Sequence, residues 1–570
     1  MNLAATIPSE PQSPIAFWFW NGALTEPELT RQMKLFREAG IFEFVIHARS
    51  GLVTKYLSEE WFSLCAAVIE EADRTGMHLW IYDEIDWPSG SAGGKITAHS
   101  DMVEHYIDEN EVLREYEDPK MRLRSPDYLS RTSIEMFLRL THERYRERFH
   151  SYFGRTIRGF FNDEIRFANA KPWSLELPDH RLFSLADRVR MTGQAFREVY
   201  VGSLARWCEE NNLLLLGHVM GEESLASQIR YLGGDLSSML SLYHVPAIDH
   251  LGTKAEGLHP SFLASAAFFM GNPITMCETG AGLPWDFTPV DLRRNTGWLY
   301  AHGIRRQVLH GFYYEENPAD WPPDMFFRWK HWNEMKAYTT WATKIQNVLD
   351  GLTPIYRVAL YYPVDEYIAD YRPNAAFTLE YESCDPIAGG RALSLHRLMQ
   401  ELPNALRQRH IDFVFATRSQ LKKALDMILV VPAGCDVDFP GTKVRQQDMS
   451  AAGVAEHILQ MLGDAPQIEG AHATCAPLDS RSDIADPYLH VLRDEGGVVM
   501  KSYQKGSGRA ISLWNAEPTA FRGTIDTGHA AYWQIFDPQS DAQGAPGLPL
   551  SRRVDVQIPA YSFVFLQAYG

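Results

Sequence analysis

The sequence is poor in cysteine and has no segment that resembles a secretion signal. Its six cysteines are dispersed, without a CxxC pair: Cys65, Cys208, Cys277, Cys384, Cys435 and Cys475. This dispersion favours reduced thiols over a disulfide framework or a zinc site. The first residues, MNLAATIPSEPQSP, have neither a basic stretch nor an apolar core. We therefore expect a cytoplasmic protein whose activity survives reducing agents.

Basic residues are too few for a protein that binds nucleic acid. Lys and Arg total 54 against 72 Asp and Glu, which gives a formal net charge of −18. A nucleic-acid binder needs a basic face to neutralise phosphates, and an anionic membrane surface repels an acidic protein. No apolar run is long enough to span a bilayer. We expect neither nucleic acid nor membrane as a partner, and the sequence leaves a homo-oligomer open.

The first 350 residues repeat one unit, in which an apolar strand, a polar turn and an amphipathic helix follow one another. The predicted strands are Ile15–Trp20, Phe42–His47, His78–Ile85, Ile157–Glu164, Leu213–Val219, Met239–Val245, Pro273–Thr279 and Arg305–Tyr314. Apolar strands separated by helices indicate parallel strands buried on both faces. Eight such units predict a (β/α)8 TIM barrel of the α/β class over residues 1–350, with an open doubly wound sheet as the alternative. A polar insertion around Glu109–Arg131 is expected to cover the barrel mouth.

The pattern changes after a long predicted helix, Phe326–Gly351. The strands RVALYYP, FVFA and MILVVPAG, with a helix at Ala392–Arg409, predict a small α/β, flavodoxin-like domain over residues 351–474. From about residue 475 the chain alternates apolar and polar residues between turns, one of them at Glu495–Gly497. This alternation predicts a C-terminal β-sandwich over residues 475–570.

Polar and aromatic residues gather where the predicted barrel strands end, which is where a TIM barrel places its active site. Aromatic residues make up 12% of the chain, and Trp and Tyr suit stacking on the apolar faces of sugars. The candidates for substrate binding are Trp20, His47, Arg49, Asp83, Glu84, Trp87, Asn162, Asp163, His218, Glu222, Tyr243, His244, Trp285, His310 and Tyr313. The alternative interpretation makes the Asp83–Glu84 pair helix caps, the histidines core residues and the tryptophans packing.

Two of the strand-end acids are candidates for catalysis. Glu164 ends GFFNDE on the fourth strand, and Glu278 follows ITMC on the seventh. Glycoside hydrolysis needs two carboxyl groups that flank one bond, one of them protonated at the working pH. Strands four and seven face each other across a barrel, so this pair would lie on opposite sides of a bound sugar. We predict that both residues are catalytic, although either one alone also suits a salt bridge or a helix cap.

Eight motifs carry a resemblance to a known family: FWFWNGALTEPELTRQM, GLVTKYLSEEW, MHLWIYDEIDWPSGSAGG, GFFNDE, GHVMGEESLASQ, VPAIDHL, CETGAG and HGFYYEENPADWPPDMFF. In this order they resemble the TIM-barrel α-L-rhamnosidases of glycoside hydrolase family 106 and their uncharacterised relatives, over residues 15–350. The resemblance implies an inverting, exo-acting hydrolase with Glu164 as general acid and Glu278 as general base. It also implies calcium at the sugar. The chain is much shorter than typical members, and CETGAGLPWDF differs from their glycine-aromatic run.

Unlike the resemblance, the residue pattern favours a site without a metal, because the sequence shows no dense group of oxygen ligands. His47, Arg49 and His218 would donate hydrogen bonds to sugar hydroxyls instead. We therefore expect an exo-acting glycosidase that removes a terminal sugar, with α-L-rhamnose as a candidate, from oligosaccharides or small glycosides. The alternative enzyme is a retaining β-glycosidase, β-galactosidase-like, with Glu278 as nucleophile. A non-catalytic sugar-binding protein is the alternative of another class.

Overall fold

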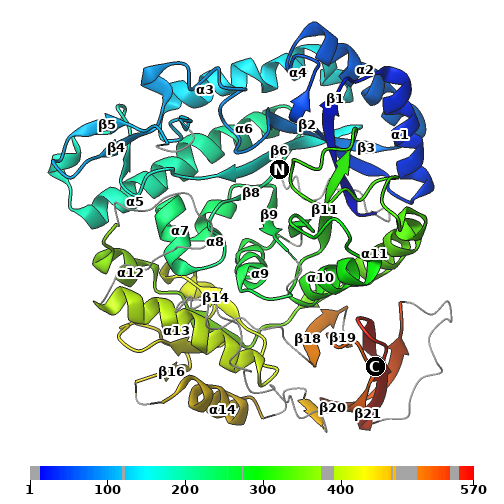
Figure 1. Cartoon of the computed structure of the whole chain (residues 1–570). Coiled ribbons are helices and arrows are strands. Elements are labelled where there is room, and N and C mark those ends of the chain that lie inside the picture. The colour runs from blue at the N-terminus through cyan, green and yellow to red at the C-terminus, as the bar shows by residue number, and fades with distance from the viewer. Residues whose placement is uncertain are drawn as a thin grey trace.

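Eight parallel strands close into a barrel, as predicted (Figure 1). The structure is a computed structural model that describes residues 13–118, 122–252, 255–272, 274–373, 390–447, 449–463, 467–469, 497–506, 508–538 and 551–569. The barrel strands, in order around the barrel, are β1 (Ile15–Gly22), β2 (Glu43–Leu52), β3 (His78–Ile85), β6 (Ile157–Ile165), β8 (Leu214–Val219), β9 (Val245–His250), β10 (Met276–Thr279) and β11 (Arg306–Tyr313).

Helices follow the strands and pack around the barrel (Figure 1). They are α1 (Glu26–Glu38), α2 (Glu59–Thr75), α3 (Arg131–Leu140), α4 (His142–Phe149), α5 (Leu185–Ala195), α6 (Gly202–Glu210), α7 (Leu225–Leu232), α8 (Leu236–Leu240), α9 (His259–Met270), α10 (Pro289–Ala301) and α11 (Met335–Asp350). Helix α2 shows why the sequence folds this way. Ser58 caps its first turn by accepting the Trp61 N–H, and Gly76 ends it with φ 69°. Side chains on one face, such as Phe62 and Val68, are buried in the layer between helices and barrel.

Strand β1 sets which residues face the barrel interior. Phe17 and Phe19 belong to the cluster of side chains inside the barrel. Trp18 and Trp20 belong to the outer layer that the helices cover. Because successive side chains on a strand point to opposite faces, this alternation decides which strand-end residues reach the mouth of the barrel.

The predicted sixth strand, Met239–Val245, is wrong. Met239 lies in helix α8, and the strand runs instead over Val245–His250. The side chain of Asp235 accepts the Ser238 N–H and begins this short helix, which buries Met239 and Leu240. A short apolar run is consistent with either a buried strand or a buried helix, and its periodicity does not separate the two.

The insertion after the third strand forms a small antiparallel sheet together with a short strand that follows β6. Its strands are β4 (His105–Ile107), β5 (Leu113–Glu115) and β7 (Pro172–Trp173), with β4 in the middle. In Figure 1 this sheet lies at one side of the barrel. None of the residues that line the pocket described below comes from Glu109–Arg131, so this segment does not form the pocket wall.

The small α/β domain has the predicted elements. Four parallel strands lie in the order β14 (Val414–Ala416), β13 (Val358–Tyr361), β15 (Ile428–Val431) and β16 (Lys443–Arg445). The helices of this region are α12 (Val364–Asp370), α13 (Gly390–Arg407) and α14 (Ala451–Leu462). Phe415 of β14 packs on Phe262 of α9, with ring centroids 4.2 Å apart. This domain therefore rests directly on the outer helices of the barrel.

The last part of the chain forms antiparallel strands around their own core (Figure 1). The strands are β12 (Thr353–Pro354), β17 (Gln467–Glu469), β18 (Val498–Lys505), β19 (Gly508–Asn515), β20 (Phe521–Phe536), β21 (Ser551–Ile558) and β22 (Phe563–Tyr569). The first half of β20 pairs with β21 and β17, and its second half pairs with β22. One long strand thus joins the two groups of strands into one seven-stranded sheet. Most of the predicted turn Glu495–Gly497 and the expected boundary at residue 475 lie outside the described residues.

Four cysteines, Cys65, Cys208, Cys277 and Cys435, are free and buried, while Cys384 and Cys475 lie outside the described residues. Among the helices that the structure describes, none combines the length and apolar character that a bilayer span requires.

Candidate active site

A pocket opens where the barrel strands end, and about 350 Å³ of space, part of it open to solvent, lies within it. It is lined by Arg49, Trp87, Asp163, Glu164, Asp249, Leu251, Glu278, Ala281, His310 and Trp321. Six of these residues were among the sequence predictions, including both predicted catalytic acids. A second cavity, at the opposite end of the strands, has Ile15, Trp80 and Met276 in its wall. That end of a TIM barrel serves stability rather than chemistry.

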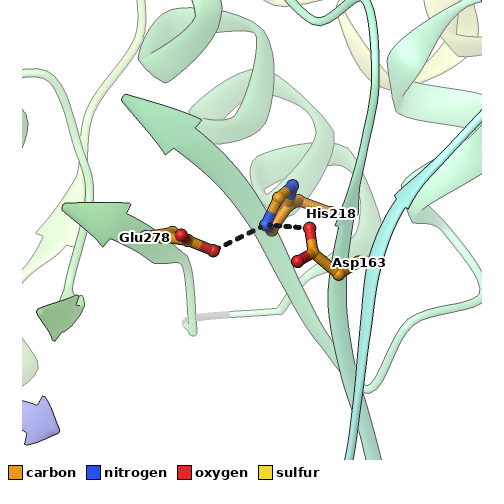
Figure 2. Close-up of side chains that lie close together, drawn as sticks. All are labelled: Asp163, His218 and Glu278. Atoms are coloured by element: carbon orange, nitrogen blue, oxygen red, sulfur yellow. Dashed lines mark hydrogen bonds and ion pairs between the residues drawn. The ribbon is translucent and has the colours of Figure 1, made fainter. Parts of the chain in front are cut away.

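Glu278 sits at the centre of a buried hydrogen-bond network. Its Oε2 lies 3.1 Å from His218 Nε2, and its Oε1 lies 2.8 Å from His310 Nδ1. His218 Nε2 is also 3.1 Å from Asp163 Oδ1, so this imidazole bridges two carboxylates (Figure 2). The other oxygen of Asp163 accepts a hydrogen bond of 2.7 Å from the Tyr82 hydroxyl. Both carboxylates are thereby fixed in position.

This network holds Glu278 ionised. Burial alone would raise the pKa of Glu278, but the hydrogen bonds from His218 and His310 outweigh it and lower the pKa to about 2. Burial opposes the charge on His218, yet the neighbouring charges of Asp163 and Glu278 raise the pKa of this imidazole well above its usual value. At neutral pH the site therefore contains a carboxylate clamped by a cationic imidazole.

Glu164 is in the opposite state. Burial, and then the charge of Asp163, raise the pKa of Glu164 to about 7. Its backbone has φ 43°, in the left-handed region that non-glycine residues rarely adopt. The pairing of β6 with β8 shifts register between Asn162 and Ile165, across this residue. Local strain of this kind is concentrated at functional sites, and here it accompanies a carboxyl group that keeps its proton near neutrality.

Replacing His218 with asparagine is expected to raise the pKa of Glu278, because burial would then be opposed by one imidazole fewer. Removal of a nearby opposite charge typically moves a pKa by about 1–3 units. The acidic limb of the pH profile of kcat/KM should therefore move upward by that amount. His331→Asn, a histidine change outside the pocket, is the matched control and should leave the limb in place. If the acidic limb of the pH profile stays in place in His218→Asn, His218 does not set the ionisation of Glu278.

Several predicted site residues lie behind the pocket and support it. Asp83 accepts hydrogen bonds from Ser89 Oγ at 2.6 Å and Asn162 Nδ2 at 2.9 Å. The Tyr243 hydroxyl donates to Asn162 Oδ1 at 3.1 Å, and Glu222 accepts the Asp249 N–H at 2.9 Å. These side chains do not line the pocket. Glu222 holds the backbone of Asp249 directly, whereas Asp83 acts through Ser89, whose Oγ accepts the Asp163 N–H at 2.9 Å.

Glu84 has a purely structural geometry. Its carboxylate accepts four backbone N–H groups at 2.6–2.9 Å, those of Ile85, Ser91, Ala92 and Gly93. All its lone pairs are thus directed at the loop that follows β3. Glu84 therefore organises this loop and does not line the pocket.

Two predicted residues, Trp20 and His244, are not at the pocket. Trp20 is fully buried in the outer layer, with its ring 5.2 Å from that of Trp61. His244 precedes β9 instead of ending a strand; its Nδ1 accepts the Leu215 N–H and its Nε2 lies 3.2 Å from Glu209. The first error ignored strand alternation, and the second followed from the misplaced sixth strand. His47 does face the interior, stacked 3.6 Å from the Tyr82 ring, but it does not line the pocket.

Two aromatic side chains, Trp87 and Trp321, form the rim of the pocket. The Arg49 guanidinium lies between the rings of Phe19 and Trp87, 4.5 and 4.6 Å from their centroids. It also forms a two-pronged ion pair with Asp320, with both N–O distances 2.9 Å. Asp320 in turn accepts the Trp321 N–H at 2.7 Å. The positive charge of Arg49 is therefore already matched, and the pair fixes the loop that carries Trp321.

The two remaining predicted aromatics flank this rim. The Tyr313 hydroxyl donates to the Trp321 carbonyl at 2.6 Å. Trp285 is 41% exposed and lies 6.5 Å from the Tyr313 ring, but it does not line the pocket. Tyr313 is fully buried and does not line the pocket; its hydroxyl supports the backbone of Trp321.

Five pocket-related residues were not predicted: Asp249, Leu251, Ala281, Asp320 and Trp321. Asp249 lies near the end of the true sixth strand and Leu251 directly follows it, so a correct boundary would have placed both at the mouth. Asp320 and Trp321 lie in the long loop after β11, whose sequence PADWPP pairs an acid with an aromatic residue. Nothing in that local pattern identifies Arg49 as the partner of Asp320.

The carboxylates of the pocket do not form the oxygen cage that calcium prefers. Asp163, His218 and Glu278 each offer one ligand atom, and these atoms lie within 4.8 Å of one another. The central donor is an imidazole nitrogen, 3.1 Å from each carboxylate, whereas Ca²⁺ takes about six to eight oxygen ligands. This donor set does not fit calcium.

No family model and no curated protein matches the sequence. Solved structures share the fold. A rhamnosidase from Novosphingobium sp. PP1Y has a TM-score of 0.67 and 11% identity, covering 100% of this chain and 83% of that one. A β-galactosidase from Bacillus circulans sp. alkalophilus has a TM-score of 0.59 and 12% identity, covering 98% and 100%. A β-galactosidase from Rahnella sp. R3 has a TM-score of 0.58 and 10% identity, covering 97% and 98%. These likenesses establish the fold, a TIM barrel with further domains.

Proposed function

We propose that this chain is an exo-acting glycoside hydrolase that removes a terminal sugar by acid/base catalysis. The observation that carries the proposal is a single pocket at the mouth of the barrel that holds two carboxyl groups, one of which, that of Glu278, contacts two histidines. Glu164 has a pKa of about 7 and Glu278 a pKa of about 2. Two titratable groups whose environments separate their pKa values are the mark of an acid and a base that act together.

In the proposed reaction, the protonated Glu164 donates its proton to the glycosidic oxygen as the bond from that oxygen to the anomeric carbon breaks. Glu278 removes a proton from a water molecule, whose oxygen forms the new bond to the anomeric carbon. His218 and His310 keep Glu278 ionised before the step. Glu164 ends as a carboxylate and Glu278 as an acid, so the site is restored when Glu278 releases one proton to solvent and Glu164 takes one up. The products are the free sugar and the alcohol.

The proposed substrate is a neutral terminal sugar on an oligosaccharide or small glycoside, with α-L-rhamnose as the leading candidate. The aromatic rim of Trp87 and Trp321 suits the apolar face of a ring beyond it. The choice of rhamnose rests on the family resemblance of the sequence motifs.

A screen of 4-nitrophenyl glycosides tests the proposal. It should cover both anomers of rhamnose, arabinose, galactose and fucose, and the wild-type protein should release nitrophenol from at least one of them. Failure to cleave any member, by protein whose fold is verified by circular dichroism, would contradict the proposal for these sugars.

The stereochemistry of the product separates this mechanism from its main alternative. A retaining β-glycosidase would use Glu278 as a nucleophile, and a low pKa suits that role as well. We expect inversion, with the carboxyl groups of Glu164 and Glu278 about 6.5–9.5 Å apart rather than about 5–5.5 Å. Proton NMR of the first-formed product reports the anomer directly. A retained configuration would replace the inverting mechanism with the retaining one.

Chelation is expected to leave the activity unchanged, because the donor set of the pocket does not fit calcium. Dialysis against EDTA should change kcat/KM by less than about twofold, within the scatter of such measurements. Complete loss of activity that Ca²⁺ alone restores would contradict this expectation and favour the calcium that the resemblance implies.

A further inference from the structure

A third carboxyl group, that of Asp249, stands beside the two proposed catalytic acids. Asp249 on β9 is the direct lateral partner of Glu278 on β10. Laterally paired residues of neighbouring parallel strands point to the same face of the sheet. Both side chains line the pocket, so Asp249 faces any sugar that occupies it.

The side chain of Asp249 has an unsatisfied oxygen. Its Oδ1 is buried and has no hydrogen-bond partner among the described residues. The backbone of Asp249 is held in place, because its N–H donates to Glu222 Oε2 at 2.9 Å. A buried polar atom without a partner is costly and rare in native structures. An oxygen left in this state at the wall of a pocket indicates a partner that arrives with the ligand.

The surroundings of Asp249 favour its neutral form. Burial, and then the charge of Glu278, raise the pKa of Asp249 well above its usual value; Glu164 and Glu222 add to this effect and His218 opposes it. A neutral carboxylic acid offers one O–H donor and one carbonyl acceptor. A sugar hydroxyl is likewise both donor and acceptor, so the two groups are complementary.

We propose that Asp249 binds a hydroxyl group of the terminal sugar and thereby selects for that hydroxyl. The proposal rests on the proposed function, since it assigns Asp249 to the same pocket. It differs from a catalytic role because no bond to the sugar is made or broken by this side chain. It also differs from a purely structural role, because the carboxyl oxygen finds its partner on the ligand.

The test compares two variants on the glycoside found by the screen. Asp249→Asn keeps one donor and one acceptor, so kcat/KM should stay within about threefold of the wild type. Asp249→Ala removes both and should lower kcat/KM by about 10- to 100-fold, the fold-change expected when a buried polar contact is lost. Asp249→Val, which also has neither donor nor acceptor, replaces the alanine variant if that one does not fold. Asp101→Asn and Asp101→Ala, at an exposed position, are the matched controls.

Monodeoxy forms of the substrate identify the hydroxyl. For one position, the deoxy substrate should lose kcat/KM with the wild type but lose nothing more with Asp249→Ala, because the contact is already absent. An unchanged kcat/KM in Asp249→Ala, an equal loss in Asp249→Asn, or additive losses at every deoxy position would overturn the inference. A wild type that cleaves no glycoside would overturn the proposed function, and this inference with it. A wild type that cleaves one while Asp249→Ala stays unimpaired would overturn only the inference.

Discussion

Replacing Glu164 with glutamine is expected to lower kcat/KM for an alkyl glycoside by about 10²- to 10⁴-fold, the usual contribution of a general acid. Glutamine keeps the size of the side chain but has no acidic proton. A dinitrophenyl glycoside should lose far less, because its leaving group departs without protonation. Steady-state kinetics on two substrates with the same sugar and different leaving groups measure this difference.

The control for this variant is Glu60→Gln, the same chemical change at an exposed position of α2. It should leave both substrates unaffected. An equal loss on the alkyl and dinitrophenyl substrates would contradict a general-acid role for Glu164 and point to a change in the shape of the pocket.

Replacing Glu278 with glutamine is expected to lower kcat/KM by about 10²- to 10⁴-fold on every substrate, whatever its leaving group. The reason is that in the proposed mechanism Glu278 acts on the attacking water, which is the same in each reaction. His218 and His310 would also lose the charge that they now contact at 3.1 and 2.8 Å. The pattern therefore differs from that of Glu164→Gln, in which the leaving group decides the loss.

Thermal unfolding of Glu278→Gln provides its control, since a loss of folded protein would mimic a loss of catalysis. The variant should unfold cooperatively like the wild type at the assay temperature. Near wild-type turnover by folded Glu278→Gln on the cognate glycoside would remove Glu278 from the mechanism.

The sequence predicted the barrel because each strand–helix unit is encoded locally. Ser58 and Gly76 bound α2 in the sequence and in the structure. The boundary of β9 failed because an apolar run around Met239 satisfies a helix as well as a strand. The alternation on β1 was legible, since Phe19 faces inward and Trp20 therefore faces the helices. Applying that rule would have removed Trp20 from the candidates.

The electrostatics of the site were less accessible to prediction. Glu84, Glu164 and Glu278 were all candidates because each lies at the end of a predicted strand, yet their surroundings differ. The carboxylate of Glu84 accepts hydrogen bonds from four backbone N–H groups. The carboxylate of Glu278 is hydrogen-bonded to two histidines from other strands. Such differences arise from partners that are far apart in the chain, for which a local pattern carries no information.

The pH dependence of kcat/KM, from about pH 3 to 9, tests the central claim most directly, because it reports the ionisations of the free enzyme. The account predicts a plateau in mild acid, where Glu278 with its pKa of about 2 is ionised and Glu164 is protonated. It predicts a fall as pH rises through about 7, when Glu164 loses its proton. With the dinitrophenyl glycoside, this fall should disappear in Glu164→Gln. An activity that rises between pH 5 and 8, or a fall that persists in Glu164→Gln, would contradict the account.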